Sequence, residues 1–385
     1  MVKAYLFPWR ANNEFTLLVD AQRFFPAMLA AIDKAEHFIL FEQYLVKSGE
    51  ILDQFIDHLL QAKLRGVQIY ILLDDFGSSE VSRTDYLRLT QAGIEVLYYN
   101  PLSWRSLYRS MRRDHRKLLV ADNRVAFVGG AGISDDYAEG DSHRMNWHDV
   151  MLRIEGENVE DWIQSFMFVW EHSSGRLPVI AEYTRLNHGD QTGRVHLSRG
   201  LLRNDILRSV ISHIHKSSHR VWLTTPYFVT NRKLRHALRR AAHNKVDVRL
   251  LLPGPISDHP WISHASRRYY HKLLQNGVKI FEYQPRFIHA KVVLCDDWVS
   301  IGSSNLDRWN QRWNLDANQA VLDSRFCAQV TSMFEYDFTQ SQLITHDEWQ
   351  RRPWYQRLRE RYYGFYVSLL HWFNYVITRM HKNRP

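Results

Sequence analysis

Two copies of one short motif hold the residues in this chain that are best suited to chemistry. Each copy has a histidine, a lysine two residues later and an aspartate five residues after the lysine. Both copies lie in apolar segments that read as β-hairpins, with the aspartate in the turn. The residues are His115, Lys117 and Asp122 in the first copy, and His289, Lys291 and Asp296 in the second.

These residue types point to chemistry on a phosphodiester. Imidazole titrates near pH 6.5, so a histidine can attack as the neutral base or donate a proton as the cation. Residues two apart on a strand face the same side, so each histidine and its lysine project together. Two such pairs can hold a phosphate and stabilise the charge of its pentavalent transition state. No further cluster has metal-ligand spacing, so we expect neither a metal nor a cofactor.

The elements around the motifs are predicted to occur twice in the same order, which indicates a duplicated α/β fold. In each copy a helix leads into a strand, a second helix leads into an apolar strand, and a glycine opens a short strand before the motif hairpin. The matching segments are 27–44 and 209–227, 51–65 and 232–243, 67–73 and 246–252, and the strands that begin at Gly93 and Gly277.

We therefore predict two similar halves, each a mixed β-sheet flanked by helices. The first half covers 1–175 and the second 195–345, because residues 174–200 break the periodicity. Since the chemistry needs both motifs, the halves are expected to pack with pseudo-two-fold symmetry and an active site at their interface. Residues 350–385 form a separate C-terminal segment.

The duplicated motif resembles that of the phospholipase D superfamily, and the resemblance extends from about residue 15 to residue 340. Within the superfamily the chain is most similar to bacterial cardiolipin synthases of the shorter type, which lack N-terminal transmembrane helices. The stretches that carry this similarity are 41–44, 112–117, 302–307 and 314–318.

The resemblance implies a phosphatidyltransferase that acts through a phosphohistidine intermediate. One histidine attacks phosphorus, and the other protonates the leaving alcohol and then deprotonates the acceptor. The family usually uses the N-terminal copy as nucleophile, which assigns attack to His115 and acid–base work to His289. The residues alone also allow the reverse assignment.

The resemblance also implies roles for four aspartates. Asp149 and Asp316 match the carboxylates that orient the catalytic histidines beyond the motifs, as the aspartate of a catalytic triad does. Residue type alone would also allow ordinary solvated or capping aspartates there. Asp122 and Asp296 belong to the motifs but lie in hairpin turns, where we expect a structural function.

Further residues are predicted to bind substrate. Ser303 and Asn305 follow the second motif in a glycine-permitted turn and offer donors to phosphate oxygens. The first motif instead ends in glycines and should contribute fewer ligands. The hairpin of the second motif is a residue shorter than usual, and Asp316 stands where glutamate is common. The basic, aromatic segment 99–116 adds Arg105, Arg109 and Arg112, which suit lipid headgroups, although a solvated basic loop is the alternative.

Composition favours an anionic partner. The net charge is +9 and the isoelectric point about 9.4. Residues 350–385 interleave aromatic and basic side chains, which suits a helix lying on an anionic membrane. A helix docked on the protein core is the alternative. No signal peptide is recognisable, so we expect peripheral attachment to the cytoplasmic face of the inner membrane.

Several functions remain open at this point. The leading one is cardiolipin synthesis from phosphatidylglycerol and a second phospholipid. A phospholipase D-type hydrolase would use the same residues with water as acceptor. A nuclease would also suit the basic charge, but no nucleic-acid-binding module is recognisable, so no nucleic-acid partner is expected. A non-catalytic membrane module is disfavoured, because both histidines and both lysines of the two motifs are intact. The sequence does not give the oligomeric state.

Overall fold

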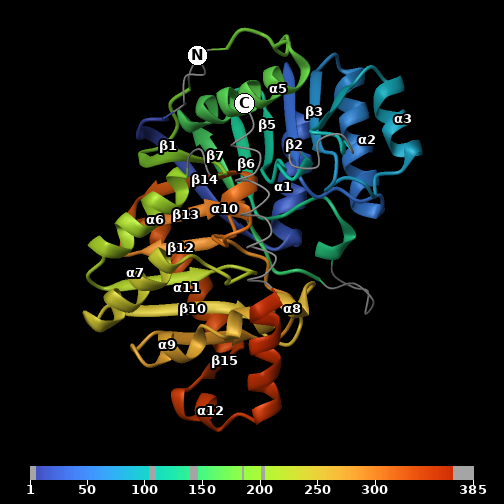
Figure 1. Cartoon of the computed structure of the whole chain (residues 1–385). Helices are drawn as coiled ribbons and strands as arrows, with labels where there is room; N and C mark the ends of the chain where they lie inside the picture. Colours follow the sequence, from blue (N-terminus) through green and yellow to red (C-terminus); the bar gives the residue numbers. More distant parts are fainter. Residues whose placement is uncertain (1–5, 104–109, 139–145, 184–185, 201–203, 367–385) are drawn as a thin grey trace, which may run out of the picture.

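A computed structural model describes residues 6–103, 110–138, 146–183, 186–200 and 204–366. The predicted ligands Arg105 and Arg109 lie outside these residues, as does the end of the C-terminal segment. The described strands form one 15-stranded mixed sheet with helices on both faces (Figure 1). The predicted α/β fold with two similar halves is confirmed.

The first half begins with a strand that the sequence did not indicate, and then follows the predicted order. Its strands β2, β5 and β6 are buried at every position, which explains their continuous apolar sequence. The elements are β1 (Arg10–Val19), α1 (Ala21–Lys34), β2 (Phe38–Gln43), α2 (Glu50–Leu64), β3 (Gln68–Asp74), α3 (Arg83–Gln91), β4 (Glu95–Tyr99), β5 (Lys117–Ala121), β6 (Val125–Gly129), η2 (Asp135–Tyr137), β7 (Val150–Gly156) and α5 (Asn158–Ser174).

The second half repeats this order and adds a final strand and a short helix. Its outer helices α6 and α7 are amphipathic and place Val210 and Leu234 on the sheet. The elements are β8 (Gln191–Arg199), α6 (Asp205–Lys216), β9 (Arg220–Thr224), α7 (Arg232–His243), β10 (Asp247–Pro253), α8 (Pro260–Arg267), α9 (Tyr270–Leu274), β11 (Lys279–Tyr283), β12 (Val292–Cys295), β13 (Trp298–Gly302), α10 (Asn310–Trp313), β14 (Leu315–Leu322), α11 (Ser324–Thr339), β15 (Ser341–Ile344) and α12 (His346–Arg351).

The strand order reflects the duplication. From one edge the sheet runs β4-β3-β2-β5-β6-β7-β1, and from β8 it continues β14-β13-β12-β9-β10-β11-β15. Strands β1 and β8 therefore meet at the centre, where Arg10 pairs with Gly193 and Asn13 with Gln191. The predicted start of the second half at residue 195 falls inside β8.

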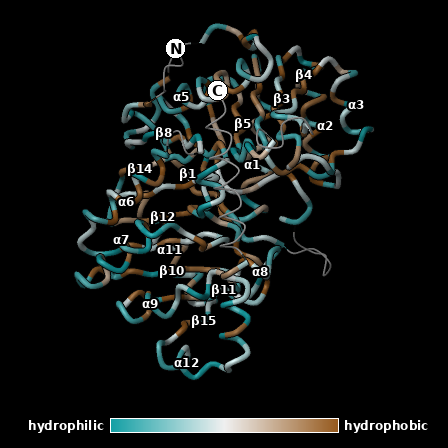
Figure 2. The backbone as a smooth tube through the Cα atoms, in the orientation of Figure 1, coloured by the Kyte–Doolittle hydropathy of each residue, from teal (hydrophilic) through white to brown (hydrophobic). Residues whose placement is uncertain are grey.

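One hydrophobic core is shared between the halves. It contains Trp162 and Phe166 of α5 together with Phe326 and Phe334 of α11. The indole N–H of Trp162 also donates to the Gln319 side chain of the other half, at 2.9 Å. Separate cores lie under α1 and α2 and under α6 and α7, and Figure 2 shows hydrophobic stretches on strands of both halves. Burial of each large side chain stabilises the fold by roughly 2–3 kcal/mol, so the shared core fixes the halves as one unit.

Candidate active site

The two motif histidines are placed by backbone pairing between the halves. The segment before β5 runs beside the start of β14, where the N–H of His115 donates to the carbonyl of Leu315 at 2.9 Å. The second motif repeats this contact with the end of the segment before β7. There the N–H of His289 donates to the carbonyl of His148 at 2.8 Å. Each histidine is thus held beside the residue that precedes an aspartate of the other half.

Because of this backbone pairing, the histidine of each half meets an aspartate of the other half. Nδ1 of His115 lies 2.9 Å from Oδ1 of Asp316, and Nδ1 of His289 lies 2.6 Å from Oδ2 of Asp149. All four side chains are buried. Because Nδ1 of each ring faces a carboxylate, Nε2 is the nitrogen that remains for a substrate. The sequence indicated these two aspartates, but it did not show that each serves the histidine of the opposite half.

The motif lysines add positive charge at the same place. Nζ of Lys117 donates to the backbone carbonyl of His115 at 2.6 Å, and Lys291 makes the equivalent contact to the carbonyl of His289. Nζ of Lys291 also lies 3.0 Å from Nε2 of His289. Both lysines are buried. The site therefore combines two imidazoles, two ammonium groups and two carboxylates.

Burial and mutual repulsion shift the titration of these groups. Burial and the charge of Lys117 lower the pKa of His115 to about 4. Burial and the charge of Lys291 lower the pKa of His289 to about 3 and that of Lys117 to about 7. Burial raises the pKa of Asp149, but the charge of Lys291 and the contact with His289 outweigh it, so the pKa is lowered. Both imidazoles are neutral at neutral pH, and a bound anion between the lysines would oppose these shifts.

The motif aspartates lie away from the histidines, at the far ends of the hairpins. Asp122 accepts from the N–H groups of His37 and Phe38 at 2.8 and 2.9 Å. Asp296 accepts from those of Ser218 and Arg220, both at 2.8 Å. Both aspartates have positive φ, 53° and 49°, which a short polar residue tolerates in a turn. Each caps the start of the neighbouring strand β2 or β9 and makes no contact with the reacting groups.

The two halves have different residues next to the carboxylate that orients each histidine. The hydroxyl of Ser303 donates to Oδ1 of Asp316 at 2.9 Å, so it supports the His115 pair. The corresponding residue of the first half is Gly130, where a Cβ would lie 2.3 Å from Oδ1 of Asp149. The glycine there reflects close packing against the carboxylate. Asn305 is buried, and its Oδ1 has no hydrogen-bond partner among the described residues.

The basic segment before the first motif divides into exposed and buried arginines. Arg112 is exposed. Arg113 is buried and donates to the carbonyl of Ser110 at 2.9 Å. Arg116 is also buried and donates to Asp114 at 3.2 Å. Successive side chains of a strand point to opposite faces, so the sequence itself places Arg116 on the face opposite His115. This alternation excludes Arg116 from the substrate ligands.

The surroundings of the two histidines are unequal. The ring of Tyr44 packs edge-on against His115 at 4.8 Å. Trp147 packs against His289 at 4.9 Å, and the hydroxyl of Tyr137 lies 3.4 Å from Nδ1 of His289.

Tyr44 also lines a mainly apolar cavity of about 480 Å³ between the halves. Other lining residues are Phe76 and Leu102 from the first half, and Trp261, Ile262 and Trp309 from the second.

His148 is a further buried histidine that the sequence did not assign. Its Nδ1 lies 2.7 Å from Asp20 and its Nε2 3.2 Å from Asp337, so it joins the first half to the second. Burial lowers the pKa of His148, but the hydrogen bonds and charges of the two aspartates raise it to about 9. It is therefore a buried cation next to Asp149 in the chain.

This shift predicts a pH-dependent contribution to stability. Because the folded-state pKa is raised from 6.5 to about 9, the contribution is complete below pH 6.5 and is lost as the pH rises through 9. Its size is up to about 3 kcal/mol. We expect the difference in unfolding free energy between the wild type and His148→Gln, measured by urea denaturation, to be largest at pH 6 and to shrink towards pH 10. A difference that stays constant would contradict the ionised state of His148.

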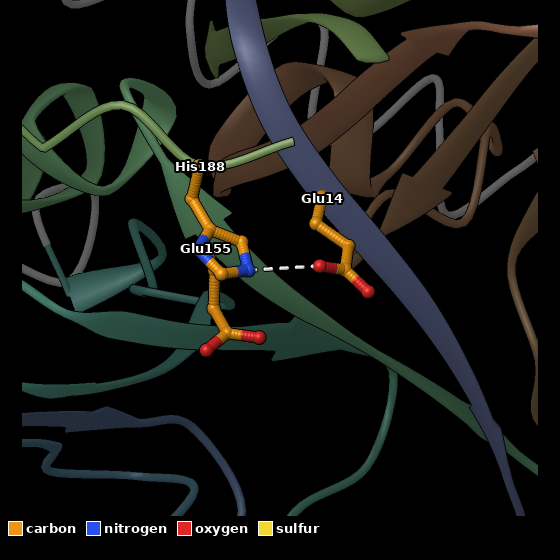
Figure 3. Close-up of side chains that lie close together, drawn as sticks. All are labelled: Glu14, Glu155 and His188. Carbon is orange, nitrogen blue, oxygen red and sulfur yellow. Dashed lines mark hydrogen bonds and ion pairs between the residues drawn. The ribbon is translucent and has the colours of Figure 1, made fainter. Parts of the chain in front are cut away.

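Three side chains elsewhere come close enough to share a cation. Glu14 of β1, Glu155 of β7 and His188 lie side by side (Figure 3), with their ligand atoms within 4.8 Å of one another. Nε2 of His188 is 2.8 Å from Oε2 of Glu14, and Arg153 donates to Glu155 at 2.9 Å. The group comes from three separate segments, so sequence spacing could not show it. Its partly exposed residues are already paired, so it carries no argument for a metal.

Known proteins resemble this chain over most of its length. A family model described as the phospholipase D-like domain of cardiolipin synthase matches residues 28–170 and 210–338. A cardiolipin synthase of Halalkalibacterium halodurans is 31% identical over 91% of this chain and 72% of its own length. Cardiolipin synthase A of Pseudomonas putida is also 31% identical, over 94% of this chain and 76% of its own length.

Solved structures agree on the fold. Phosphatidylserine synthase of Haemophilus influenzae superposes with a TM-score of 0.73 over 96% of both chains, at 12% identity. Polyphosphate kinase of Porphyromonas gingivalis gives 0.58 over 91% of this chain and 52% of its own, at 14% identity. The family match covers both motifs and most of the chain, and the chain therefore belongs to the family of phospholipase D-like cardiolipin synthase domains.

Proposed function

We propose that this protein is a phosphatidyltransferase that makes cardiolipin from phosphatidylglycerol and a second phospholipid, through a phosphohistidine. The observation that carries the proposal is the crossed pairing of His115 with Asp316 and of His289 with Asp149, beside two buried lysines. Such a pair orients an imidazole and stabilises its cation. The curated relatives are named cardiolipin synthases, which supports cardiolipin as the product.

In the first step, Nε2 of His115 attacks the phosphorus of the donor lipid. The bond from phosphorus to the headgroup oxygen breaks, and the leaving glycerol takes a proton from the His289 cation. His289 is neutral in the free site, so we expect it to take up this proton as the anionic phosphodiester binds between Lys117 and Lys291. Their charges also stabilise the transition state.

In the second step, the roles reverse. His289 removes the proton from the hydroxyl of the acceptor, whose oxygen attacks phosphorus and breaks the bond to His115. Asp316 stabilises the His115 cation, and Ser303 holds that carboxylate through its hydroxyl. We propose Asn305 as a ligand of the phosphate oxygens, because its buried amide lies next to this turn. Water in place of the lipid hydroxyl would give hydrolysis.

The cavity beside His115 suits a lipid. Its mainly apolar lining comes from both halves, and Phe76 and Leu102 remain 56% and 60% exposed. Exposed large apolar side chains at a cavity mouth favour an apolar ligand. We infer that the glycerol and acyl portions of a phospholipid enter here, with the phosphate at the histidines.

The proposed function is tested by incubating the protein with phosphatidylglycerol vesicles and resolving the products by mass spectrometry. Cardiolipin together with released glycerol is the expected result. Phosphatidic acid without cardiolipin would instead identify a hydrolase. No product from phosphatidylglycerol, either alone or mixed with phosphatidylethanolamine, would contradict the proposal.

We also propose that the C-terminal helix attaches the protein to the membrane surface. Residues 354–366 are helical and pack on α8, where the ring of Tyr363 stacks on His264 at 5.5 Å. The opposite side is solvent-exposed and apolar. It carries Trp354, Leu358, Tyr362 and Phe365, which are 59–74% exposed. No helix in the described part of the chain is long and apolar enough to cross a bilayer. The cytoplasmic side remains a prediction.

The exposed aromatic side predicts a specific binding defect. The double variant Tyr362→Ser/Phe365→Ser should bind phospholipid vesicles at least about tenfold more weakly, because both side chains would enter the headgroup region. The control is Tyr336→Ser on α11, since Tyr336 is 63% exposed and Tyr362 is 65% exposed. Co-sedimentation with vesicles measures the effect. Equal binding by the double variant and the control would contradict a membrane role for this helix.

A further inference from the structure

A basic groove lies on the surface of the second half, apart from the histidines. It has a volume of about 740 Å³ and runs between α7 on one side and α9 with the two residues before it on the other. None of its lining residues, all within the described part of the chain, is acidic. They are Arg232, Lys233, Arg235, His236 and Arg239 on α7, and Arg268, Tyr269, Lys272 and Leu273 on the other wall.

Two of these arginines are held in place at the base of the groove. The guanidinium of Arg235 stacks over Tyr269 at 4.0 Å, and that of Arg268 lies 4.6 Å from the same ring. Arg235 also donates to the carbonyl of Thr230, and Arg268 to the carbonyl of Gly364. Their positions are therefore fixed before any ligand arrives. Planar guanidinium groups held in this way match the oxygens of a phosphate.

The groove concentrates positive charge, and its lining includes no carboxylate. Burial lowers the pKa of Arg235, and the charges of Arg308, Arg268 and Arg239 lower it further, although Tyr269 opposes them. Three further cations of the lining, Arg232, Lys233 and Lys272, are exposed at the rim. A concave surface of one sign attracts an anion, and the anion relieves the repulsion.

The groove is continuous with the exposed aromatic helix. Arg268 contacts Gly364 of that helix, and Tyr269 and Tyr363 belong to one small apolar cluster around Val229 and Ala265. Figure 1 shows the helix next to α8, on the same half as α7 and α9. A membrane that receives the aromatic side chains would therefore lie close to the basic groove.

We propose that this groove is a second anion site, which binds the phosphate headgroup of an anionic phospholipid in the membrane and is separate from the reacting centre. The inference rests on the membrane-surface part of the proposed function. Fixed arginines at the base would hold the phosphate, and the exposed cations at the rim would attract the surrounding anionic surface. Such a site would make attachment depend on anionic lipid.

The test compares two triple variants with the same change in net charge. The groove variant is Arg232→Gln/Lys233→Gln/Lys272→Gln. The control is Arg23→Gln/Lys34→Gln/Arg83→Gln, which removes three exposed cations of the first half. Vesicles of phosphatidylcholine alone, and with 30% phosphatidylglycerol, are used for co-sedimentation at about 0.15 M salt. Thermal unfolding checks that both variants stay folded.

The groove variant is expected to bind the phosphatidylglycerol vesicles about tenfold or more weakly than the control, and the two should bind phosphatidylcholine vesicles equally. If both variants lost vesicle binding equally, the loss would follow from the change in net charge alone, and the proposed site would be overturned. No loss would overturn it as well. Unchanged vesicle binding with loss of binding to a single-stranded oligonucleotide would assign the groove to a different polyanion. The readout is binding, so it does not depend on whether cardiolipin is formed.

Discussion

Replacing His115 by alanine is expected to reduce turnover of phosphatidylglycerol by at least about 10⁴-fold, because it removes the proposed nucleophile. We expect no rescue by Lys117, which is held by the carbonyl of residue 115, or by His289, which the proposed mechanism uses for proton transfer. Initial rates of glycerol release measure the effect directly.

A matched control is available for this variant. His188→Ala removes an exposed imidazole that pairs with Glu14, and turnover should stay within about twofold of the wild type. His115→Gln keeps a polar side chain of similar size if alanine disturbs the buried site. Turnover retained by both His115 variants would show that the nucleophile lies elsewhere.

The crossed carboxylates predict two different defects. Asp316→Asn should slow formation of the covalent intermediate by about 10²–10⁴-fold, since it leaves His115 without a charge partner. Asp149→Asn should affect proton transfer through His289, and therefore also the transfer to the acceptor. Rapid-quench measurement of adduct formation and decay separates the two steps.

Ser303→Ala provides a graded comparison for Asp316. It removes one donor to the carboxylate, at 2.9 Å, but it leaves the charge in place, so the loss should be smaller than for Asp316→Asn. If Asp149→Asn abolished adduct formation while Asp316→Asn left it intact, the roles of the two histidines would be exchanged. Equal, small losses in all three variants would contradict an orienting role for either carboxylate.

The sequence predicts those parts of the structure that depend on local pattern. Alternating and continuous apolar runs placed both hairpins, and residue type placed Asp122 and Asp296 in their turns. The same pattern put each motif histidine and lysine on one face. These features follow from the two-residue period of a strand and from turn chemistry, so they need no knowledge of how the halves pack.

The parts that were missed depend on contacts between distant segments. Which aspartate meets which histidine is decided by the pairing of Asp114 with Leu315 and of His148 with Ile288 across the halves. The charge on His148 likewise needs Asp20 and Asp337, which come from opposite ends of the chain. Strand β8 was missed because its polar residues are typical of a linker. Its place at the centre of the sheet depends on pairing with β1 and β14, which the local pattern does not show.

The most direct test of the account is to map the covalent intermediate. The protein is mixed with phosphatidylglycerol and quenched at neutral pH, because a phosphohistidine is labile in acid, and its peptides are then analysed by tandem mass spectrometry. A phosphatidyl group is expected on His115 in the wild type and none in His115→Gln. A phosphatidyl group on His289, or turnover to cardiolipin without any covalent adduct, would contradict the account.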